Sequence, residues 1–137
     1  MSERKYYLDT NVCVDYLRGR HVRIRERLFA MSPVDVEIPS IVKAELYYGA
    51  EKSDCKEKNI EMVRAFLAPF EIASFDEVAA GIYGTIRAGL ERIGLPIGPN
   101  DLIVATTVLS RNGILVTRNV GEFSRVTGLM IENWAAD

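Results

Sequence analysis

Short apolar runs alternate along the chain with longer stretches in which apolar residues recur at helical spacing. Short runs bounded by turn residues are typical of strands, and a spacing of three and four residues is typical of amphipathic helices. The short runs predict strands at residues 5–8, 36–38, 70–73, 114–116 and 129–132. The longer stretches predict helices at residues 10–17, 22–30, 54–67, 76–93 and 100–110, and a further helix that starts at Ser40.

Strands that alternate with helices predict an α/β domain built on a mostly parallel five-stranded sheet. The length of 137 residues fits a single domain. Ser40 is a good candidate for the N-cap of the helix that it begins, and Asp76 for the start of the helix at 76–93. Residues 94–99 contain two prolines and two glycines, so we expect a loop there.

Four acidic residues stand at places that suggest a common site. Asp9 follows the first predicted strand and Glu122 follows the fourth, and ligands of open parallel sheets bind outside the carboxyl ends of the strands. Glu45 falls beside Tyr48 on the apolar side of its helix. Asp101 opens the most apolar helix, and we expect that helix to reach the same edge only by crossing the sheet obliquely.

Each of these acids also has a simpler explanation. Asp9 could cap the first helix, and Glu45 could reach water from the edge of its apolar stripe. Asp101 could be a first-turn carboxylate that faces the helix dipole, and Glu122 could be a solvated turn residue. A carboxylate on an apolar face nevertheless costs free energy unless it is paired, hydrogen-bonded or bound to a metal. The agreement of the acids on one sheet edge therefore favours a shared chemical role.

Charge and composition narrow the class of protein. The net charge of −2 provides no overall basic surface for nucleic acid. Cys13 and Cys55 lack the spacing of a zinc site, so we expect reduced thiols in a cytoplasmic protein. His21 is the single histidine, which disfavours an acid–base pair of histidines. The longest apolar stretch, 102–109, is too short for a membrane span, and we expect no signal peptide.

A carboxylate cluster without histidine suits a hard divalent cation such as Mg²⁺ or Mn²⁺. Such ions activate water and neutralise charge that develops on a phosphodiester. Three functions stay open at this point: a metal-dependent nuclease, a phosphatase or phosphotransferase that uses Asp9 as nucleophile, and a non-catalytic binding module. The second usually requires another acid two positions after the nucleophile, where this chain has Asn11.

Four segments resemble, in order and spacing, the motifs of PIN-domain ribonucleases. They are residues 8–11 (LDTN), 40–46 (SIVKAEL), 100–105 (NDLIVA) and 115–123 (LVTRNVGEF). Residues 128–134 (GLMIENW) are similar to the ending of the toxin members called VapC. No single motif is specific, but the four together extend the resemblance to one PIN domain over residues 1–137.

The resemblance implies a PIN-like fold, in which a parallel sheet carries helices on both faces, and a site for Mg²⁺ or Mn²⁺. It also implies endoribonuclease activity, usually on structured RNA such as tRNA. Toxins of this family pair with an antitoxin, here of the VapB type, and are commonly homodimers. The phosphotransferase and the binding module remain the alternatives.

Carried over residue by residue, the resemblance makes the four acids Asp9, Glu45, Asp101 and Glu122 catalytic, with Asp9 and Asp101 as the metal ligands. Many relatives have an aspartate where this chain has Asn119, so either Glu122 or Asn119 fills the fourth position. Supporting hydrogen bonds are expected from Thr10, Asn11, Ser40, Thr117 and Asn119.

Residues 18–27 are rich in arginine. Arg20, Arg23 and Arg27 are expected to share one helix face. A solvated surface is one explanation. A contact with RNA phosphates, or with an acidic part of the antitoxin, is the other.

Overall fold

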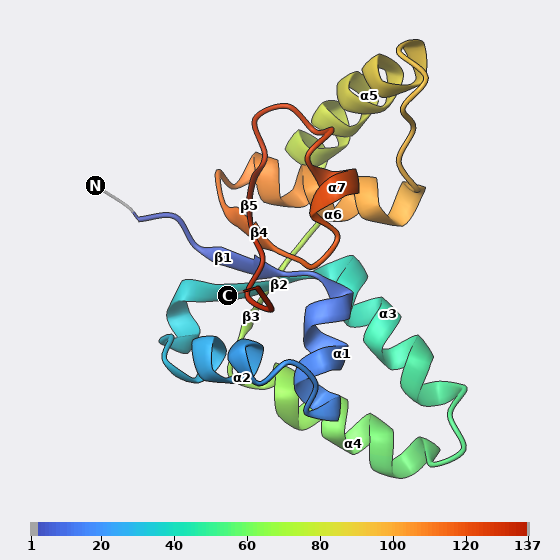
Figure 1. The fold of residues 1–137 in the computed structure, drawn as a ribbon. Coiled ribbons are helices and arrows are strands. Elements are labelled where there is room, and N and C mark those ends of the chain that lie inside the picture. Colours follow the sequence, from blue (N-terminus) through green and yellow to red (C-terminus); the bar gives the residue numbers. More distant parts are fainter. Residues whose placement is uncertain (1–2, 137) are drawn as a thin grey trace.

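A computed structural model describes residues 3–136 (Figure 1). The strands are β1 (Tyr6–Leu8), β2 (Val36–Pro39), β3 (Glu71–Ala73), β4 (Ile114–Val116) and β5 (Met130–Glu132). The helices are α1 (Thr10–Arg18), α2 (Val22–Phe29), α3 (Ser40–Glu51), α4 (Lys56–Leu67), α5 (Glu77–Arg92), α6 (Pro99–Ser110) and α7 (Val120–Phe123), and η1 (Pro33–Asp35) is a 3₁₀ turn. All predicted strands are confirmed, whereas η1 and α7 were not predicted.

The five strands form one parallel sheet in the order β3-β2-β1-β4-β5. In Figure 1, α1, α2 and α4 lie below the sheet, and α5 and α6 lie above it. The α/β prediction with helices on both faces is therefore confirmed. The chain runs from β1 outward to β3 and then returns to the other side of β1, so the strand order reverses between β1 and β4. Ligands bind at such a reversal in open parallel sheets.

The central strands are buried on both faces, as is typical of parallel sheets covered by helices. Leu8 of β1 and both Leu115 and Val116 of β4 have no exposed surface. After β5, the buried Trp134 packs on Tyr6 of β1, with ring centroids 5.6 Å apart. The central strands therefore form a rigid base for the loops that follow them. No helix within residues 3–136 is long and apolar enough to cross a membrane.

The start of α3 differs from the prediction. Pro39 occupies the N-cap position, and Ser40 is the first helical residue without a capping hydrogen bond from its side chain. The reason is that β2 extends through Pro39, which pairs with Ala73 of β3, so the chain passes from strand to helix without a separate capping residue. Tyr48, expected on the buried side of α3, is 64% exposed.

Asp101 reaches the carboxyl edge of the sheet without the oblique crossing expected for α6. Residues 111–113 alone connect α6 to β4, so α6 ends at the amino end of β4. Its 12 residues extend about 18 Å back toward the carboxyl edge at 1.5 Å per residue. A strand of three residues such as β4 is only about 10 Å long. The N-terminus of α6 therefore reaches the carboxyl edge by simple helix geometry, and it carries Asp101 there.

Candidate active site

A cavity opens at the carboxyl edge of the sheet, beside the point where the strand order reverses. We call it the acid cavity. Its lining residues are Asp9, Thr10, Asn11, Val14, Asp15, Arg20, Glu45, Asp101, Arg118 and Asn119. They come from α1 and the residues on either side of it, from α3, from α6 and from the segment after β4, so four separate parts of the chain build one site.

Asp9 joins the end of β1 to the start of α1. It is only 5% exposed. Its Oδ1 accepts a hydrogen bond from the Thr10 backbone N–H at 2.8 Å, and its Oδ2 accepts one from the Thr117 hydroxyl at 2.8 Å. Burial raises the pKa of Asp9 and the charge of Glu45 adds to the rise, while these hydrogen bonds oppose it. Asp9 is thus the N-cap of α1, as the simpler explanation holds, and it also lines the cavity.

Glu45 reaches the same cavity from α3 and is half-buried. The Thr10 hydroxyl donates to its Oε1 at 2.7 Å. Thr10 therefore contacts two acids, Asp9 through its backbone and Glu45 through its side chain. This shared partner fixes the position of α3 relative to the N-terminus of α1.

Asp101 lies in the first turn of α6, and the negative charges of the other three acids act on its carboxyl group. Its pKa is raised to about 6, first by burial, and then by the negative charges of Asp9, Glu122 and Glu45. A hydrogen bond shared with Glu122 also favours the protonated carboxyl. The helix dipole would lower this pKa, so burial and the repulsion among the carboxylates together outweigh it. The four predicted acids therefore form one electrostatic cluster.

Glu122 is hydrogen-bonded to Asp101 and is not among the residues that line the cavity. It accepts a hydrogen bond from Asn119 Nδ2 at 3.1 Å and one from the Gly98 backbone N–H at 3.4 Å. Asn119 in turn donates its backbone N–H to Thr117 Oγ1 at 3.0 Å. Asn119 thus orients Glu122 instead of replacing it. Ser40, also predicted to support the site, is not among the residues that line the cavity.

The expectation that three arginines share a helix face is wrong. Arg20 precedes α2, in the turn after α1, and lines the acid cavity. Arg27 on α2 contacts Glu132 at 3.2 Å and lies over the Trp134 ring at 5.3 Å, so it holds the C-terminal segment. Arg23 lies on α2 and is not a lining residue. The helical pattern could not show where the chain breaks between α1 and α2.

Two charged residues of the cavity had no predicted role. Asp15 of α1 is almost fully buried, and Arg118, after β4, donates its Nε to Asp15 Oδ2 at 2.5 Å. The partners are 103 residues apart in the chain. An acid three positions after Val12, on the buried face of α1, was the one signal that a partner is needed. No sequence pattern identifies Arg118 as that partner.

The donor set of the cavity fits a hard divalent cation. In the described part of the chain, the cavity lining contains carboxylates and neither histidine nor cysteine, and oxygen donors of this kind suit Mg²⁺ or Mn²⁺. Within residues 3–136, no three His, Cys, Asp or Glu side chains are grouped closely enough to hold a metal by themselves. Mg²⁺ commonly takes one or two carboxylates and completes its shell with water and substrate phosphate. Two carboxylates, from Asp9 and Asp101, therefore meet its requirements.

Asp101 makes the stability of the metal-free protein depend on pH. Its pKa is about 6 in the folded protein against an ordinary value of 3.8. Between these values the folded protein binds more protons than the unfolded chain, so stability falls as pH rises. Because Asp101 is partly exposed, we discount this effect to about 1 kcal/mol.

Urea unfolding in EDTA at pH 4, 5, 6 and 7 measures this dependence. Asp101→Asn is the matched control, and it should lose about 1 kcal/mol of the difference between pH 4 and pH 7. An identical pH dependence in both proteins would show that the pKa of Asp101 is not raised in the folded protein.

The comparisons with known proteins agree with this fold. Residues 6–129 match the family model of the PIN domain. The chain therefore belongs to the PIN-domain family. Within the family, its relatives carry the name VapC. It is 42% identical over 130 residues to the tRNA(fMet)-specific endonuclease VapC of Salmonella typhimurium. The matched residues cover 95% of this chain and 98% of that protein. It is 40% identical over 131 residues to the protein of the same name from Shigella flexneri, with 96% and 98% covered.

Solved structures of the family have the same fold. The structure of VapBC2 from Rickettsia felis bound to a promoter DNA fragment superposes with a TM-score of 0.88 at 39% identity, and covers 94% of this chain and 98% of that one. DNA-bound VapBC from Salmonella typhimurium gives a TM-score of 0.86 at 40% identity, with 96% and 99% covered. The fold predicted from the motifs is thus shared along nearly the whole chain.

Proposed function

We propose that this protein is a metal-dependent endoribonuclease, the toxin of a toxin–antitoxin pair, which hydrolyses phosphodiester bonds in tRNA. The observation that carries the proposal is the convergence of Asp9, Glu45 and Asp101 on one cavity, with Glu122 hydrogen-bonded to Asp101. Family membership and relatives named tRNA(fMet)-specific endonucleases support the reaction and the substrate class. The proposal includes a homodimer in the cytoplasm, which rests on the family alone.

Each acid of the cavity and each residue that holds it has a separate role in the proposed reaction. Asp9 and Asp101 would hold Mg²⁺ or Mn²⁺, and an ion there supplies activation of water and neutralisation of charge on the phosphate. Thr10 and Thr117 fix both oxygens of Asp9, which keeps its ligand geometry in place. Glu45 has its Oε1 held by the Thr10 hydroxyl, and in the proposed reaction its other oxygen would accept the proton of the attacking water.

The alternatives fit the cavity less well. An aspartate nucleophile of a phosphotransferase usually has a second acid two positions after it, where this chain has Asn11. A binding module without catalysis has no need of clustered carboxylates that raise the pKa of Asp101, because this repulsion costs stability. Arg20, on the rim of the same cavity, is the proposed contact for an RNA phosphate.

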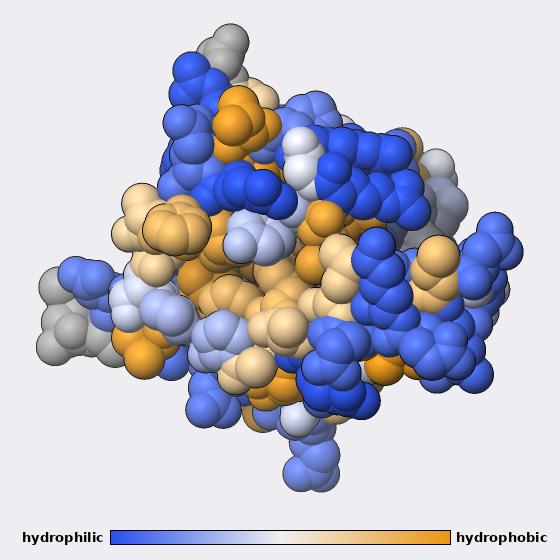
Figure 2. Space-filling view, turned by 90° about the horizontal axis from the view of Figure 1, so that it is seen from below, coloured by the Kyte–Doolittle hydropathy of each residue, from blue (hydrophilic) through white to orange (hydrophobic). Residues whose placement is uncertain are grey.

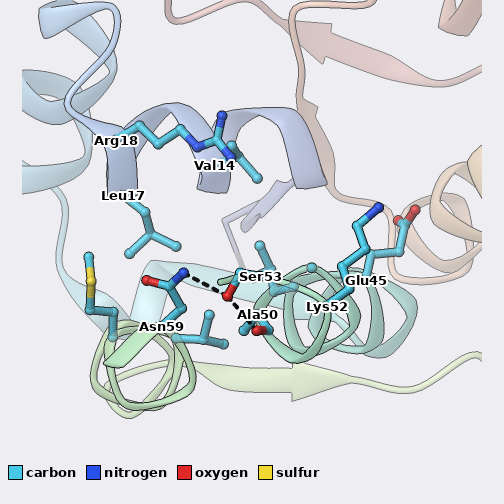
Figure 3. Close-up of a pocket in the computed structure, with 12 residues that line it drawn as sticks. Val14, Leu17, Arg18, Glu45, Ala50, Lys52, Ser53 and Asn59 are labelled. Atoms are coloured by element: carbon cyan, nitrogen blue, oxygen red, sulfur yellow. Dashed lines mark hydrogen bonds between the residues drawn. The ribbon is translucent and has the colours of Figure 1, made fainter. Parts of the chain in front are cut away.

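A second hollow supports the antitoxin part of the proposal. It lies between α1, α3 and α4, where Figure 3 shows Leu17 pointing into the space. Its lining is largely apolar, with Val14, Leu17, Leu46, Met62 and Val63. Asn59 donates to Ser53 at 2.9 Å, and Ser53 donates to the Ala50 carbonyl at 2.7 Å, so these polar groups satisfy one another. We call this the helix hollow.

The side of the sheet that carries α1, α2 and α4 also presents apolar surface (Figure 1 and Figure 2). Figure 2 shows apolar side chains at the centre of the face seen from below, with hydrophilic residues around them. Phe29 is 84% exposed and Met62 is 39% exposed. Large exposed apolar patches mark interaction sites. Because Glu45 lines both hollows, an antitoxin of the VapB type that filled the helix hollow could place a basic side chain on the carboxylates. The solved structures of similar chains are toxin–antitoxin complexes, which favours this partner.

The chemistry of the products tests the proposed reaction. Incubation of the protein with unfractionated tRNA in Mg²⁺ or Mn²⁺ should yield fragments with 5′-phosphate and 3′-hydroxyl ends, because activated water attacks phosphorus and the 3′ oxygen leaves. Ligation and phosphatase treatment of the fragments identify these ends, and EDTA should abolish cleavage. Fragments with 2′,3′-cyclic phosphates, or cleavage that persists in EDTA, would exclude this mechanism.

A further inference from the structure

The ion pair between Asp15 and Arg118 joins α1 to the segment that follows β4. The Asp15 side chain is 2% exposed and the Arg118 side chain is 38% exposed. Arg118 Nε and Nη2 donate to the two oxygens of Asp15, at 2.5 Å and 3.4 Å, and its backbone N–H donates to Asn11 Oδ1 at 3.5 Å. The guanidinium is therefore held at one edge by a buried carboxylate, while the rest of it remains at the surface.

The unpaired edge of Arg118 belongs to the acid cavity. Arg118 lines the cavity together with Asp9 and Asp101, and its positive charge lowers the pKa of Asp9. Within residues 3–136, its Nη1 makes none of the hydrogen bonds found for the side chain. An arginine has five N–H donors in a rigid planar arrangement, so it can hold a carboxylate at one edge and still offer a donor to phosphate at another.

A purely structural role does not explain this arrangement. A buried ion pair adds little stability compared with apolar side chains of similar volume, because both charges lose their hydration. RNA, however, is a polyanion, and a cavity lined by carboxylates repels it unless cations, the bound metal among them, offset the repulsion. A fixed arginine on the cavity wall provides such a cation.

We propose that Arg118, oriented by the buried Asp15, binds a phosphate of the RNA beside the acid cavity and so positions the bond to be cleaved. The inference deepens the proposed ribonuclease function and rests on it. Arg118 touches the substrate, whereas Asp15 acts through Arg118 as a positioning residue. Arg20, which lines the same cavity, adds a second positive charge.

The direct test removes the ion pair without changing the net charge of the protein. In the double variant Asp15→Asn/Arg118→Gln, binding of unfractionated tRNA is measured by filter binding in EDTA across a series of KCl concentrations. We expect affinity to fall about 10-fold and the slope of log K against log[KCl] to decrease by about 1, as for one lost phosphate contact. The rate of cleavage at subsaturating tRNA should fall in parallel, whereas the rise in melting temperature on adding Mn²⁺ should stay as in wild type.

Two further variants make the result decisive. Arg118→Lys keeps a cation for Asp15, but its single ammonium is occupied by that pair, so we expect the same loss of tRNA binding with the fold retained. If the double variant fails to fold, Arg118→Lys alone tests whether Arg118 binds phosphate. The matched control, Arg87→Gln/Glu91→Gln, removes an exposed ion pair of α5, whose residues do not line the cavity, and should bind tRNA like wild type.

The outcomes distinguish a failure of the role given to Arg118 from a failure of the proposed ribonuclease function. If wild type cleaves tRNA and the folded Arg118 variants keep its affinity and salt slope, the ion pair is structural and the inference is wrong, while the ribonuclease proposal stands. If wild type neither binds nor cleaves tRNA, the proposed function fails and the inference fails with it.

Discussion

Replacing Asp101 with asparagine should lower kcat/KM for tRNA cleavage by about 10³-fold, roughly 4 kcal/mol of transition-state stabilisation, and leave the protein folded. The side chain keeps its size but loses the charge that would hold the metal. The folded protein also loses a carboxylate whose pKa is raised by burial and three neighbouring acids. In EDTA the variant should therefore melt at a higher temperature than wild type, and it should gain less from Mg²⁺ or Mn²⁺.

Asp9→Asn should show the same loss of cleavage. Asp35→Asn is the control for both variants, because Asp35 is an exposed acid of η1 that does not line the cavity. Initial rates and melting curves of the four proteins, with and without metal, measure the effect. Lower melting temperatures in EDTA for both site variants, combined with a wild-type response to metal, would mean that these carboxylates only cap helices.

Placing a charge in the helix hollow should release the protein from its antitoxin. Met62→Glu buries a carboxylate beneath the partner proposed to fill this hollow. We expect inhibition by the cognate VapB-type antitoxin to weaken about 100-fold, since a central apolar contact of an interface contributes about 2–3 kcal/mol. Cleavage of tRNA by the uninhibited variant should be unchanged, because Met62 does not line the acid cavity.

Val78→Glu is the matched control, since Val78 is an exposed apolar residue of α5 outside the helix hollow. A titration of antitoxin against tRNA cleavage compares the two variants. Reversing the charge of the antitoxin's basic residue that reaches the carboxylates should weaken inhibition as well. Equal inhibition of wild type and Met62→Glu would place the antitoxin elsewhere on the surface.

The sheet and the acids could be predicted because they depend on local patterns. Strands such as β1 and β4 are continuous apolar runs, and a polar residue that follows such a run marks the carboxyl edge. Asp9 and Thr117 occupy these positions, and the hydrogen bond between them at 2.8 Å closes the gap between neighbouring strands. Residues at the ends of adjacent parallel strands meet whatever the length of chain between them.

Features that depend on distant partners could not be predicted. Nothing in the sequence links Asp15 to Arg118, because their contact depends on how α1 packs beside the segment after β4. The capping role given to Ser40 was wrong because tertiary pairing extends β2 through Pro39. Arg20 was assigned to a helix since its spacing matched Arg23 and Arg27, but the helix begins only at Val22.

Mn²⁺ binding by isothermal titration calorimetry tests the central claim most directly, namely that the carboxylates of Asp9 and Asp101 together hold a divalent cation. Titrations of wild type, Asp9→Asn, Asp101→Asn and the control Asp35→Asn are made on metal-free protein at pH 7.5, above the pKa of about 6 of Asp101. Saturable binding by wild type and by Asp35→Asn, lost in both site variants, is the predicted result. Equal Mn²⁺ binding by all four proteins would contradict the account.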